Sequence, residues 1–559
     1  MLICGVKVSH DGGVAVIDDD RLVCSIEIEK IGNGQRYSPL GDLDQVTKIL
    51  ADEGIAPADV DQFVVDGWWA ARGAATPSVE TSRRGERVLL PVAPYVDSAD
   101  TSECLRRYEF TGTDIAEGTG VSRGYVSYHH ASNHALGAYC TSPFAARGES
   151  SLVLVWDGGM IPRVYEVVAG TLAIKPVASL FPIVGNIFPD FCRHFDPFRV
   201  DTSAMSHDDD MRIHLEIAGK AMAYAALGTV HEDSFPVFDQ LFRQFGGIST
   251  DNAFTLGEKV TANRDELLPG LSNADIITTF QAYLGNKLLR ALSRLVRLRF
   301  PGQRPNLCMA GGCALNITWN TLLREHELFS DIWVPPFPND SGAAIGTACC
   351  EMFRGGRHRA LQWNVYSGPK LISGPALTGW SASACDERRI AEILHREGEP
   401  VVVLAGRAEL GPRALGNRSI LAPATTPAMK DTLNCIKNRA DYRPVAPICL
   451  ETRAAEAFDP GGADPYMLFE HRMRPGWAAR VPAVVHLDGT ARLQTVGASA
   501  HTPAHAILSE YERLSGIPVL CNTSANLNGH GFFPDVATAM SWGRTRYVWS
   551  EGTLYTRTA

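Results

Sequence analysis

Two histidines four residues apart could hold a metal ion. His130 and His134 lie in YHHASNHALGAY, and a helix would place both imidazoles on one face. Asp340, in FPNDSGAAIG, follows an apolar run and could add a carboxylate. Two histidines and one carboxylate form a triad with open coordination positions, which suits iron(II), manganese or another divalent metal. Polar surface histidines and a helix-capping aspartate would give the same pattern, so the spacing alone leaves both interpretations open.

Three glycine turns follow apolar stretches and could bring backbone N–H groups close to phosphates. The turns are Gly12 and Gly13 beside His10 and Asp11, Gly158 and Gly159 beside Asp157, and Gly311 and Gly312 before Asn316. Glycine also serves ordinary turns, so each signal is weak by itself. The chain has neither a Walker A sequence nor G-x-G-x-x-G, which excludes the common nucleotide-binding loops.

The densest group of cations lies between residues 406 and 443. GRAELGPRALGNRSILA and IKNRADYRPVAP interleave basic residues with Gly and Pro. The cations are Arg407, Arg413, Arg418, Lys437, Arg439 and Arg443. A solvated helix face would alternate charge sign, whereas cations on tight turns can present planar forks to phosphate oxygens. We therefore predict an anion site in this stretch.

Polar side chains also end two later apolar strands, in VVHLDGTARLQTV and LCNTSANLNG. They include His486, Asp488, Arg492, Gln494, Asn522, Ser524 and Asn526. Buried polar groups need partners, which either a bound ligand or ordinary turn chemistry at the strand ends could supply.

The elements that must position these residues alternate between strands and helices. Apolar runs at 2–8, 150–157, 307–310, 399–406 and 517–522 predict strands, and helical spacing predicts helices at 128–139, 211–227 and 276–297. The pattern of a strand followed by Asp-Gly-Gly occurs at Asp11 and again at Asp157, about 150 residues later, which suggests a duplicated α/β domain. A polar, Gly- and Arg-rich stretch at 354–368 predicts a domain boundary.

Composition limits the class of protein. The 559 residues carry 52 Lys and Arg against 62 Asp and Glu, a net charge of −10, which argues against nucleic acid as a partner. No run approaches the roughly 20 apolar residues of a membrane span, and the N-terminus lacks a signal-peptide pattern. The thirteen cysteines include no C-x-x-C pair, which argues against a cysteine zinc site. We expect a cytoplasmic monomer or homodimer without membrane or nucleic-acid partners.

Together these stretches resemble the O-carbamoyltransferases of natural-product biosynthesis, whose members act on tobramycin, nodulation factors, cephems and ansamycins. The resemblance covers nearly the whole chain and includes HH-x-x-x-H, AGG-x-ALN, GPRALGNRSI and K-x-R-x-x-x-R. HDGGVAVIDDDRL and RYSPL near the N-terminus look most similar to the cephem and ansamycin members. Met160 stands where many members have an acidic residue after D-G-x-G, which puts any metal or substrate role at that position in doubt.

The resemblance implies an α/β protein of two domains. Residues 1–355 would form a Kae1-like domain of two lobes, of the actin and Hsp70 type, and residues 365–559 a YrdC/Sua5-like domain. Carbamoyl phosphate and ATP, with Mg, would react in the second domain to give carbamoyl adenylate and pyrophosphate. The adenylate would then meet the hydroxyl of a small-molecule acceptor in the first domain.

The resemblance also implies roles for individual residues. The metal ligands would be His130, His134 and Asp340. The nucleotide would lie at Gly12, Gly311, Gly312 and Asn316, with Asp157 and Lys220 near its phosphates. Carbamoyl phosphate and ATP would be held by Arg413, Arg439, Arg443, Ser524 and Asn526, with Arg418 and Lys437 acting in catalysis. His10 would be the general base for the acceptor hydroxyl, or would orient the carbamoyl group.

Two other classes of protein share parts of this pattern. Hydrogenase-maturation carbamoyltransferases carry paired zinc-binding cysteines that this chain lacks, and the acidic charge argues against the tRNA threonylcarbamoyl system. A non-catalytic ATP-binding protein on an actin-like fold would have no need of the cations and the candidate metal ligands. Release of pyrophosphate that depends on carbamoyl phosphate would separate this last class from an enzyme.

Overall fold

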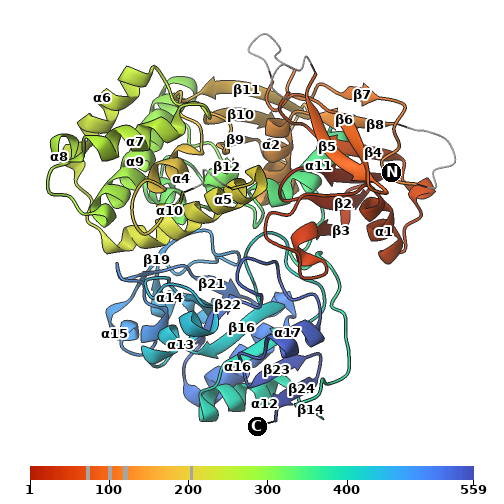
Figure 1. Cartoon of the computed structure of the whole chain (residues 1–559), viewed down its shortest axis with the longest axis vertical. Helices are drawn as coiled ribbons and strands as arrows, with labels where there is room; N and C mark the ends of the chain where they lie inside the picture. The colour runs from red at the N-terminus through yellow and green to blue at the C-terminus, as the bar shows by residue number, and fades with distance from the viewer. Residues whose placement is uncertain (71–75, 98–102, 118–123, 202–204, 559) are drawn as a thin grey trace. The chain divides into compact units, whose positions relative to one another are not determined.

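The computed structural model of the chain describes residues 1–70, 76–97, 103–117, 124–201 and 205–558. The chain divides into two compact units. Unit 1 comprises Met1–Ile28 and Tyr37–Asn364, and unit 2 comprises Glu29–Arg36 and Val365–Ala559. The chain therefore enters unit 2 twice, first for a short segment and then for its C-terminal part (Figure 1).

Unit 1 contains two sheets that share one strand order. In each sheet three antiparallel strands form a meander, and two parallel strands extend it from the first strand of the meander. The first sheet has one more edge strand, which is antiparallel to its neighbour. The orders are β3-β2-β1-β4-β8-β7 and β11-β10-β9-β12-β13. This repeat confirms the predicted duplicated α/β domain and, with it, the two-lobed actin-like fold of the N-terminal half.

The strand bounds in unit 1 are as follows. The first sheet contains β1 (Leu2–Lys7), β2 (Gly13–Asp18), β3 (Arg21–Glu27), β4 (Gln62–Asp66), β7 (Tyr108–Phe110) and β8 (Tyr125–Tyr128). The second contains β9 (Ser151–Val155), β10 (Arg163–Val168), β11 (Ala173–Ser179), β12 (Leu307–Ala310) and β13 (Ile332–Trp333). A separate hairpin joins β5 (Ser78–Arg83) to β6 (Glu86–Pro91).

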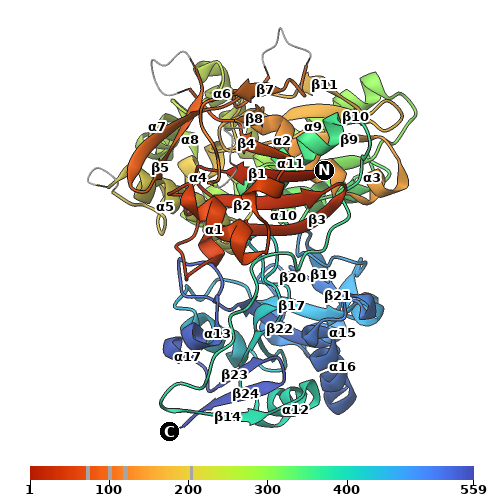
Figure 2. The ribbon, with the colours of Figure 1, turned by 90° about the vertical axis from the view of Figure 1, so that its right-hand side faces the viewer.

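Two helices of unit 1 each pack on the sheet that the other helix follows, and they also pack against one another (Figures 1 and 2). α2 (His130–Cys140) follows the first sheet but packs on β9 and β12 of the second, and α11 (Ala343–Arg354) follows the second sheet but packs on β1, β2 and β4 of the first. A Cβ atom on Gly346 would come within 2.2 Å of the Asn133 carbonyl oxygen, so the crossing needs glycine at this position. The crossing brings the N-terminal ends of α2 and α11 together.

Unit 1 has further helices, several of which pack on one another. They are α1 (Asp44–Asp52), α3 (Pro143–Arg147), α4 (Ile187–Cys192), α5 (His207–Tyr224), α6 (Phe235–Phe245), α7 (Ala253–Ala262), α8 (Arg264–Leu267), α9 (Asn273–Arg299) and α10 (Ile317–Glu325). The helices predicted at 128–139, 211–227 and 276–297 correspond to α2, α5 and α9. α9 begins earlier than its leucine pattern because Ser272 and Asp275 form a capping box. None of the described helices combines the length and the apolar composition that crossing a membrane requires.

Unit 2 is built on one mixed sheet with the order β14-β24-β23-β15-β16-β22-β17-β21. Its strands are β14 (Trp380–Ala384), β15 (Val401–Leu404), β16 (Arg418–Pro423), β17 (Ala446–Leu450), β21 (Gln494–Val496), β22 (Val519–Ser524), β23 (Tyr547–Ser550) and β24 (Thr553–Arg557). A small second sheet contains β18 (Phe458–Asp459), β19 (His471–Met473) and β20 (Thr490–Ala491). The likeness of unit 2 to the YrdC/Sua5 fold stays a prediction.

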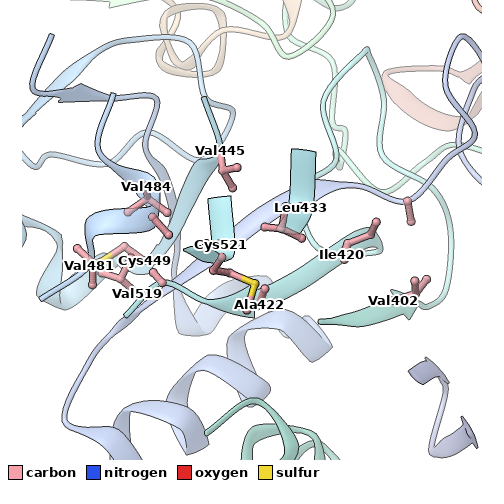
Figure 3. Close-up of a cluster of buried hydrophobic side chains, with 14 of the residues drawn as sticks. Val402, Ile420, Ala422, Leu433, Val445, Cys449, Val481, Val484, Val519 and Cys521 are labelled. Atoms are coloured by element: carbon pink, nitrogen blue, oxygen red, sulfur yellow. The ribbon is translucent and has the colours of Figure 1, made fainter. Parts of the chain in front are cut away.

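Both faces of the large sheet in unit 2 are buried. Along β15, Val402 and Leu404 belong to one core cluster, and Val401 and Val403 belong to the other. The first core includes α13 (Ala428–Ile436) and α17 (Val536–Trp542), and Figure 3 shows Val402 and its neighbours in it. The second includes α12 (Glu387–Glu392) and α16 (Pro503–Ser515). A strand buried on both faces reads as the continuous apolar run seen in EPVVVLAG. α14 (Ala454–Ala457) and α15 (Pro475–Ala478) complete the helices of unit 2.

Candidate metal centre and cationic site

The three predicted metal ligands come together where α2 and α11 begin. His130 and His134 lie one turn apart on α2, and Asp340 lies in the turn that leads into α11. The Nε2 atoms of His130 and His134 are 3.4 and 3.3 Å from Oδ1 of Asp340. The close crossing of the two helices therefore places one carboxylate beside both imidazoles.

Asp157 joins these three residues. It follows β9, and its Oδ2 and Oδ1 atoms lie 3.8 Å from Nε2 of His130 and 3.9 Å from Nε2 of His134. The four residues, here called the metal group, are buried and offer ligand atoms that all lie within 4.8 Å of one another. The resemblance implies a place for Asp157 near nucleotide phosphates, whereas the structure places its carboxylate beside the two histidines.

Three further buried residues that the sequence analysis did not single out support the metal group. Asp66, at the end of β4, lies 2.8 Å from Nδ1 of His130 and accepts a hydrogen bond from Nζ of Lys7 at 2.8 Å. Lys7 also lies 2.8 Å from Oδ2 of Asp340, and the side-chain amide of Asn133 donates to Asp66. Histidines that bind metals usually donate their second N–H to such a carboxylate, which fixes the tautomer and the ring orientation.

The sequence holds a signal for two of these residues. VVDG at 64–67 repeats the strand-Asp-Gly pattern that marks Asp157. Lys7 is a lone lysine within the apolar strand LICGVKV, and a buried lysine needs anionic partners. Asn133 has no comparable signal, since its contact with Asp66 depends on which face of α2 is turned toward β4.

The electrostatic balance of this region favours a bound cation. Three buried carboxylates, of Asp66, Asp157 and Asp340, lie near the ammonium of Lys7, and these four groups sum to a formal charge of −2. Burial raises the pKa of Asp340, but Lys7 and His130 outweigh it, and the pKa lies well below its usual value. Burial lowers the pKa of His130, but Asp66 and Asp340 raise it well above its usual value. The carboxylates thus stay ionised and attract either a proton or a metal cation.

The arrangement of the imidazoles fits a metal. Nδ1 of His130 faces Asp66, so its Nε2 carries the lone pair when the ring is neutral. That Nε2 lies 3.0 Å from Nε2 of His134. Two imidazole nitrogens at this distance cannot both carry a proton, and a shared cation satisfies both lone pairs. His130, His134, Asp157 and Asp340 are thus a suitable donor set for a divalent metal.

His10 lies beside the metal group. Its Nδ1 is 3.0 Å from Oδ2 of Asp11, its Nε2 is 3.6 Å from Oδ2 of Asp340, and its ring packs edge-on against Trp68. With 23% of its side chain exposed, it is more accessible than any histidine or carboxylate of the metal group. Burial lowers the pKa of His10, but Asp340 and Asp11 raise it above its usual value. With Nδ1–H donated to Asp11, Nε2 can accept a proton.

The predicted glycine turns have their N–H groups engaged within the chain. The N–H groups of Gly12 and Gly311 donate to backbone carbonyls at 2.9 and 2.7 Å, and that of Gly312 donates to the Asp157 carboxylate at 2.6 Å. Gly311 has φ +88°, and a Cβ atom there would lie 2.4 Å from the carbonyl oxygen of Trp156. Gly12 and Gly311 therefore allow close approach of the backbone to itself, and the expected place of the three glycines at a nucleotide stays a prediction.

Two other residues assigned to the nucleotide also contact the protein. The side chain of Asn316 accepts a hydrogen bond from the N–H of Trp319 and caps α10. Lys220, on α5, donates to Glu216 at 2.6 Å and is 43% exposed. Met160 is buried where many members of the family carry an acid. The nucleotide roles of Asn316 and Lys220 stay predictions.

In unit 2, a buried pair holds the glycine- and arginine-rich loop. Oε1 of Glu409 accepts N–H groups of Leu415, Asn417 and Arg418 at 2.7, 2.8 and 3.1 Å. The guanidinium of Arg418, 1% exposed, donates to four backbone carbonyls, two of them those of Ala405 and Gly406. Arg418 thus braces the loop, and the catalytic role that the resemblance implies for it stays a prediction. Arg413 lies half-buried on the same loop.

Lys437 joins the next loop to the end of β22. Its ammonium donates to the carbonyls of Ser524 and Asn526 at 2.8 and 2.6 Å and to Oδ1 of Asn526 at 2.5 Å. Burial, followed by the nearby guanidinium groups of Arg439 and two other arginines, holds the pKa of Lys437 well below its usual value. The predicted residues Lys437, Ser524 and Asn526 thus form one network.

Arg439, Arg443 and Arg492 concentrate positive charge beside this network. Burial, followed by Arg443, lowers the pKa of Arg439 to about 9, and burial, followed by Arg443 and Arg439, lowers that of Arg492 to about 10. Nη2 of Arg439 and Nε of Arg492 are buried without a hydrogen-bond partner within the described part of the chain. We call Lys437, Arg439, Arg443 and Arg492 the cationic site. Cations that raise one another's energy in this way are stabilised by an anion.

Two family models match the chain. The model described as carbamoyltransferase N-terminus matches residues 2–349, and the model described as carbamoyltransferase C-terminus matches residues 391–548. The first match includes the whole metal group, and the second includes the whole cationic site.

Individual relatives are similar over their full length. The chain is 44% identical to nodulation protein U of Sinorhizobium fredii (strain NBRC 101917 / NGR234), covering 99% of both chains. It is 32% identical to the 3'-hydroxymethylcephem-O-carbamoyltransferase of Streptomyces clavuligerus, covering 100% of both. The identity is higher to the nodulation protein, which corrects the expectation that the N-terminal pattern points to the cephem members. The activator of the 2-hydroxyisocaproyl-CoA dehydratase from Clostridium difficile, a solved structure, is 16% identical, with a TM-score of 0.33 over 64% of this chain and 96% of that chain.

Proposed function

This chain belongs to the carbamoyltransferase family, and from that premise we propose that it is an ATP-dependent O-carbamoyltransferase acting on a hydroxyl of a small secondary metabolite. Carbamoyltransferase activity follows from the family. The proposal is that the donor is carbamoyl phosphate, that the group passes through carbamoyl adenylate, and that the acceptor is of the antibiotic or nodulation-factor type.

The cationic site carries this proposal. Carbamoyl phosphate and ATP are both polyanions, so bringing them together requires several cations. Arg439 and Arg492 each keep a buried guanidinium nitrogen without a partner in the described chain, and their positive charges disfavour one another. Phosphate oxygens would supply both the missing acceptors and the missing negative charge.

Carbamoyl adenylate would form in unit 2. Water cleaves carbamoyl phosphate to carbamate and inorganic phosphate. A carbamate oxygen then attacks the α-phosphorus of ATP, and Mg-bound pyrophosphate leaves, so that carbamoyl adenylate remains. Arg439, Arg443 and Arg492 would bind the phosphates, with Arg413 near them, and Lys437 would be oriented by Ser524 and Asn526.

Transfer to the acceptor would take place at the metal group of unit 1. A divalent metal bound by His130, His134, Asp157 and Asp340, with iron(II) as the favoured ion, would supply a Lewis acid. His10 would accept the proton of the acceptor hydroxyl at Nε2 while Asp11 holds Nδ1. The hydroxyl oxygen would attack the carbamoyl carbon, and AMP would leave. In the alternative role, His10 would orient the carbamoyl group.

The proposal is tested by following two products of the purified protein. Pyrophosphate should be released from ATP only when carbamoyl phosphate is present. A panel of hydroxylated compounds, with a nodulation factor and a 3'-hydroxymethylcephem among them, should yield one product heavier by one carbamoyl group. The proposal would be refuted if pyrophosphate were released equally with and without carbamoyl phosphate. It would also be refuted if no compound of the panel were carbamoylated and no adenylate were formed. Metal analysis of the protein as isolated tests the choice of iron.

A further inference from the structure

A short segment from the N-terminal sequence belongs to unit 2. Glu29–Arg36 lies between β3 and α1, and both flanking stretches of the chain are part of unit 1. The residues on either side are bonded within unit 1, where the N–H of Ile28 donates to the carbonyl of Gly12 at 2.8 Å and the N–H of Gly12 donates to the carbonyl of Ser38 at 2.9 Å. Both ends of the segment are thus held by hydrogen bonds within unit 1, and the residues between them pack as part of unit 2.

The segment pairs with the turn that follows Asn526. The N–H of Arg36 donates to the carbonyl of Gly529 at 2.9 Å, and the N–H of Gly531 donates to the carbonyl of Gly34 at 3.0 Å. Nδ1 of His530 lies 2.9 Å from the carbonyl oxygen of Asn33. These contacts on both sides of one turn fix the register of the segment.

Gly531 shows how close this pairing is. A Cβ atom there would lie 2.0 Å from the carbonyl oxygen of Glu29 and 3.1 Å from the N atom of Lys30. The backbone φ of Gly531 is not in the left-handed region, so the requirement for glycine comes from the segment itself.

Lys30 connects the segment to the arginine loop. Its ammonium is buried and donates to the carbonyls of Glu409 and Gly411 at 2.6 and 2.7 Å. It also lies 4.8 Å from the centre of the Phe532 ring. Glu409 in turn holds the N–H groups of the loop up to Arg418. Lys30 thus fixes the first turn of the loop on which Arg413 is carried.

Arg36 is placed beside the cationic site by the same pairing. The side-chain amide of Asn526 donates a hydrogen bond to the carbonyl of His530, and its Oδ1 accepts one from the ammonium of Lys437. Gln35 pairs with His530, so only one residue and one turn separate Arg36 from the network of Lys437. The charge of Arg36 accordingly contributes to the lowered pKa of Lys437.

We propose that Glu29–Arg36 is a working part of the phosphate site of unit 2, in which Arg36 contacts a phosphate of ATP or of carbamoyl phosphate and Lys30 positions the arginine loop. The inference rests on the proposed function of the cationic site. It adds a phosphate-binding cation from a distant part of the sequence: Lys30 and Glu409, which join the segment to the arginine loop, are 379 residues apart.

The first test substitutes Arg36. In Arg36→Gln, binding of inorganic pyrophosphate, measured by calorimetry, should weaken at least about tenfold, because one charge-assisted contact is lost. Arg36→Lys should recover part of this loss, and Arg513→Gln, an exposed arginine of unit 2 paired with Glu510, should bind as the unaltered protein does. Separate KM values for ATP and carbamoyl phosphate identify which phosphate Arg36 contacts.

The second test displaces the segment without removing a charge. Gly531→Ala should weaken pyrophosphate binding at least as much as Arg36→Gln, since the added Cβ overlaps Glu29. Gly476→Ala, where a Cβ atom would meet open space, is the matched control. Unchanged pyrophosphate binding in both Arg36→Gln and Gly531→Ala would overturn the inference. If only the proposed reaction is wrong, pyrophosphate release will not depend on carbamoyl phosphate, but the two variants will still weaken pyrophosphate binding.

Discussion

Nδ1 of His130 lies 2.8 Å from a carboxylate oxygen of Asp66, and this oxygen also accepts a hydrogen bond from the ammonium of Lys7. The contact orients the imidazole so that its Nε2 points to the other members of the metal group. Asp66 therefore acts on a metal through its histidine, without being a ligand itself.

Asp66→Asn should lower metal affinity about 10- to 100-fold, the usual effect of removing a carboxylate that orients a ligating histidine. The isosteric amide keeps the fold but no longer favours a proton on Nδ1. Metal content after dialysis against a graded chelator measures the change, with exposed Glu80→Gln as the control. Full metal retention in Asp66→Asn would show that His130 is oriented by other contacts.

His130→Ala should abolish metal binding and carbamoyl transfer but leave release of pyrophosphate, because the latter is assigned to the cationic site of unit 2. Neighbouring His129 is the matched control: its Nδ1 contacts the carbonyl of Pro94, and it is not in the metal group. His129→Gln should keep the metal. Equal loss of pyrophosphate release in His130→Ala would contradict the division of labour between the two sites.

Much of the fold could be predicted because it depends on local patterns. Alternation of apolar strands with helices at 3.6-residue spacing gave α2, α5 and α9, and the repeat of strand-Asp-Gly-Gly indicated the duplicated sheets. The entry of Glu29–Arg36 into unit 2 could not be predicted in this way. That segment is specified by long-range contacts, such as Lys30 with Glu409, for which the local sequence has no periodicity.

The candidate site was predicted unevenly for a related reason. The spacing of His130 and His134 identified two members of the metal group, since helical spacing alone places them on one face. The resemblance implies ligand roles for Arg418 and Gly311, which stay predictions, and the structure adds contacts that residue type does not reveal: Arg418 donates to backbone carbonyls and Gly311 allows close approach of the chain. Residue type shows what a side chain can bind, and only the fold decides whether protein groups already occupy it.

Arg418→Ala should act first on stability. Its guanidinium donates to four backbone carbonyls, two of them in buried contacts, and leaving these two unsatisfied should lower the free energy of unfolding by about 2–4 kcal/mol. Adenylate formation should fall as the loop loosens, and Arg418→Lys should restore neither property fully because an ammonium has no planar fork. Urea unfolding measures the effect. Unchanged stability with lost activity would instead support direct contact between Arg418 and a substrate.

His486 should make unit 2 sensitive to acid. Burial, together with Arg492 and Lys430, lowers its pKa to about 4. A base with a lower pKa in the folded chain binds fewer protons when folded, so stability is lost as the pH falls from about 6.5 to about 4, by at most about 3 kcal/mol. His486→Gln should lose less stability over this range than the unaltered protein in urea unfolding. Equal losses would show that His486 is not the titrating group.

Arg439→Gln should separate stability from function. The arginine is buried among like charges, its pKa is lowered to about 9, and its Nη2 lacks a partner within the described chain. Removing the charge should therefore leave the free energy of unfolding unchanged or raise it by about 1 kcal/mol, while pyrophosphate binding falls at least about tenfold. Calorimetry and urea unfolding on the same preparation measure both.

Because Nε of Arg439 donates to Asn434 at 2.6 Å, Asn434→Ala is the companion variant: it frees the guanidinium and should weaken binding without removing charge. A marked loss of stability in Arg439→Gln with intact binding would mean that the cations stabilise the fold, and the anion site would then have to lie elsewhere.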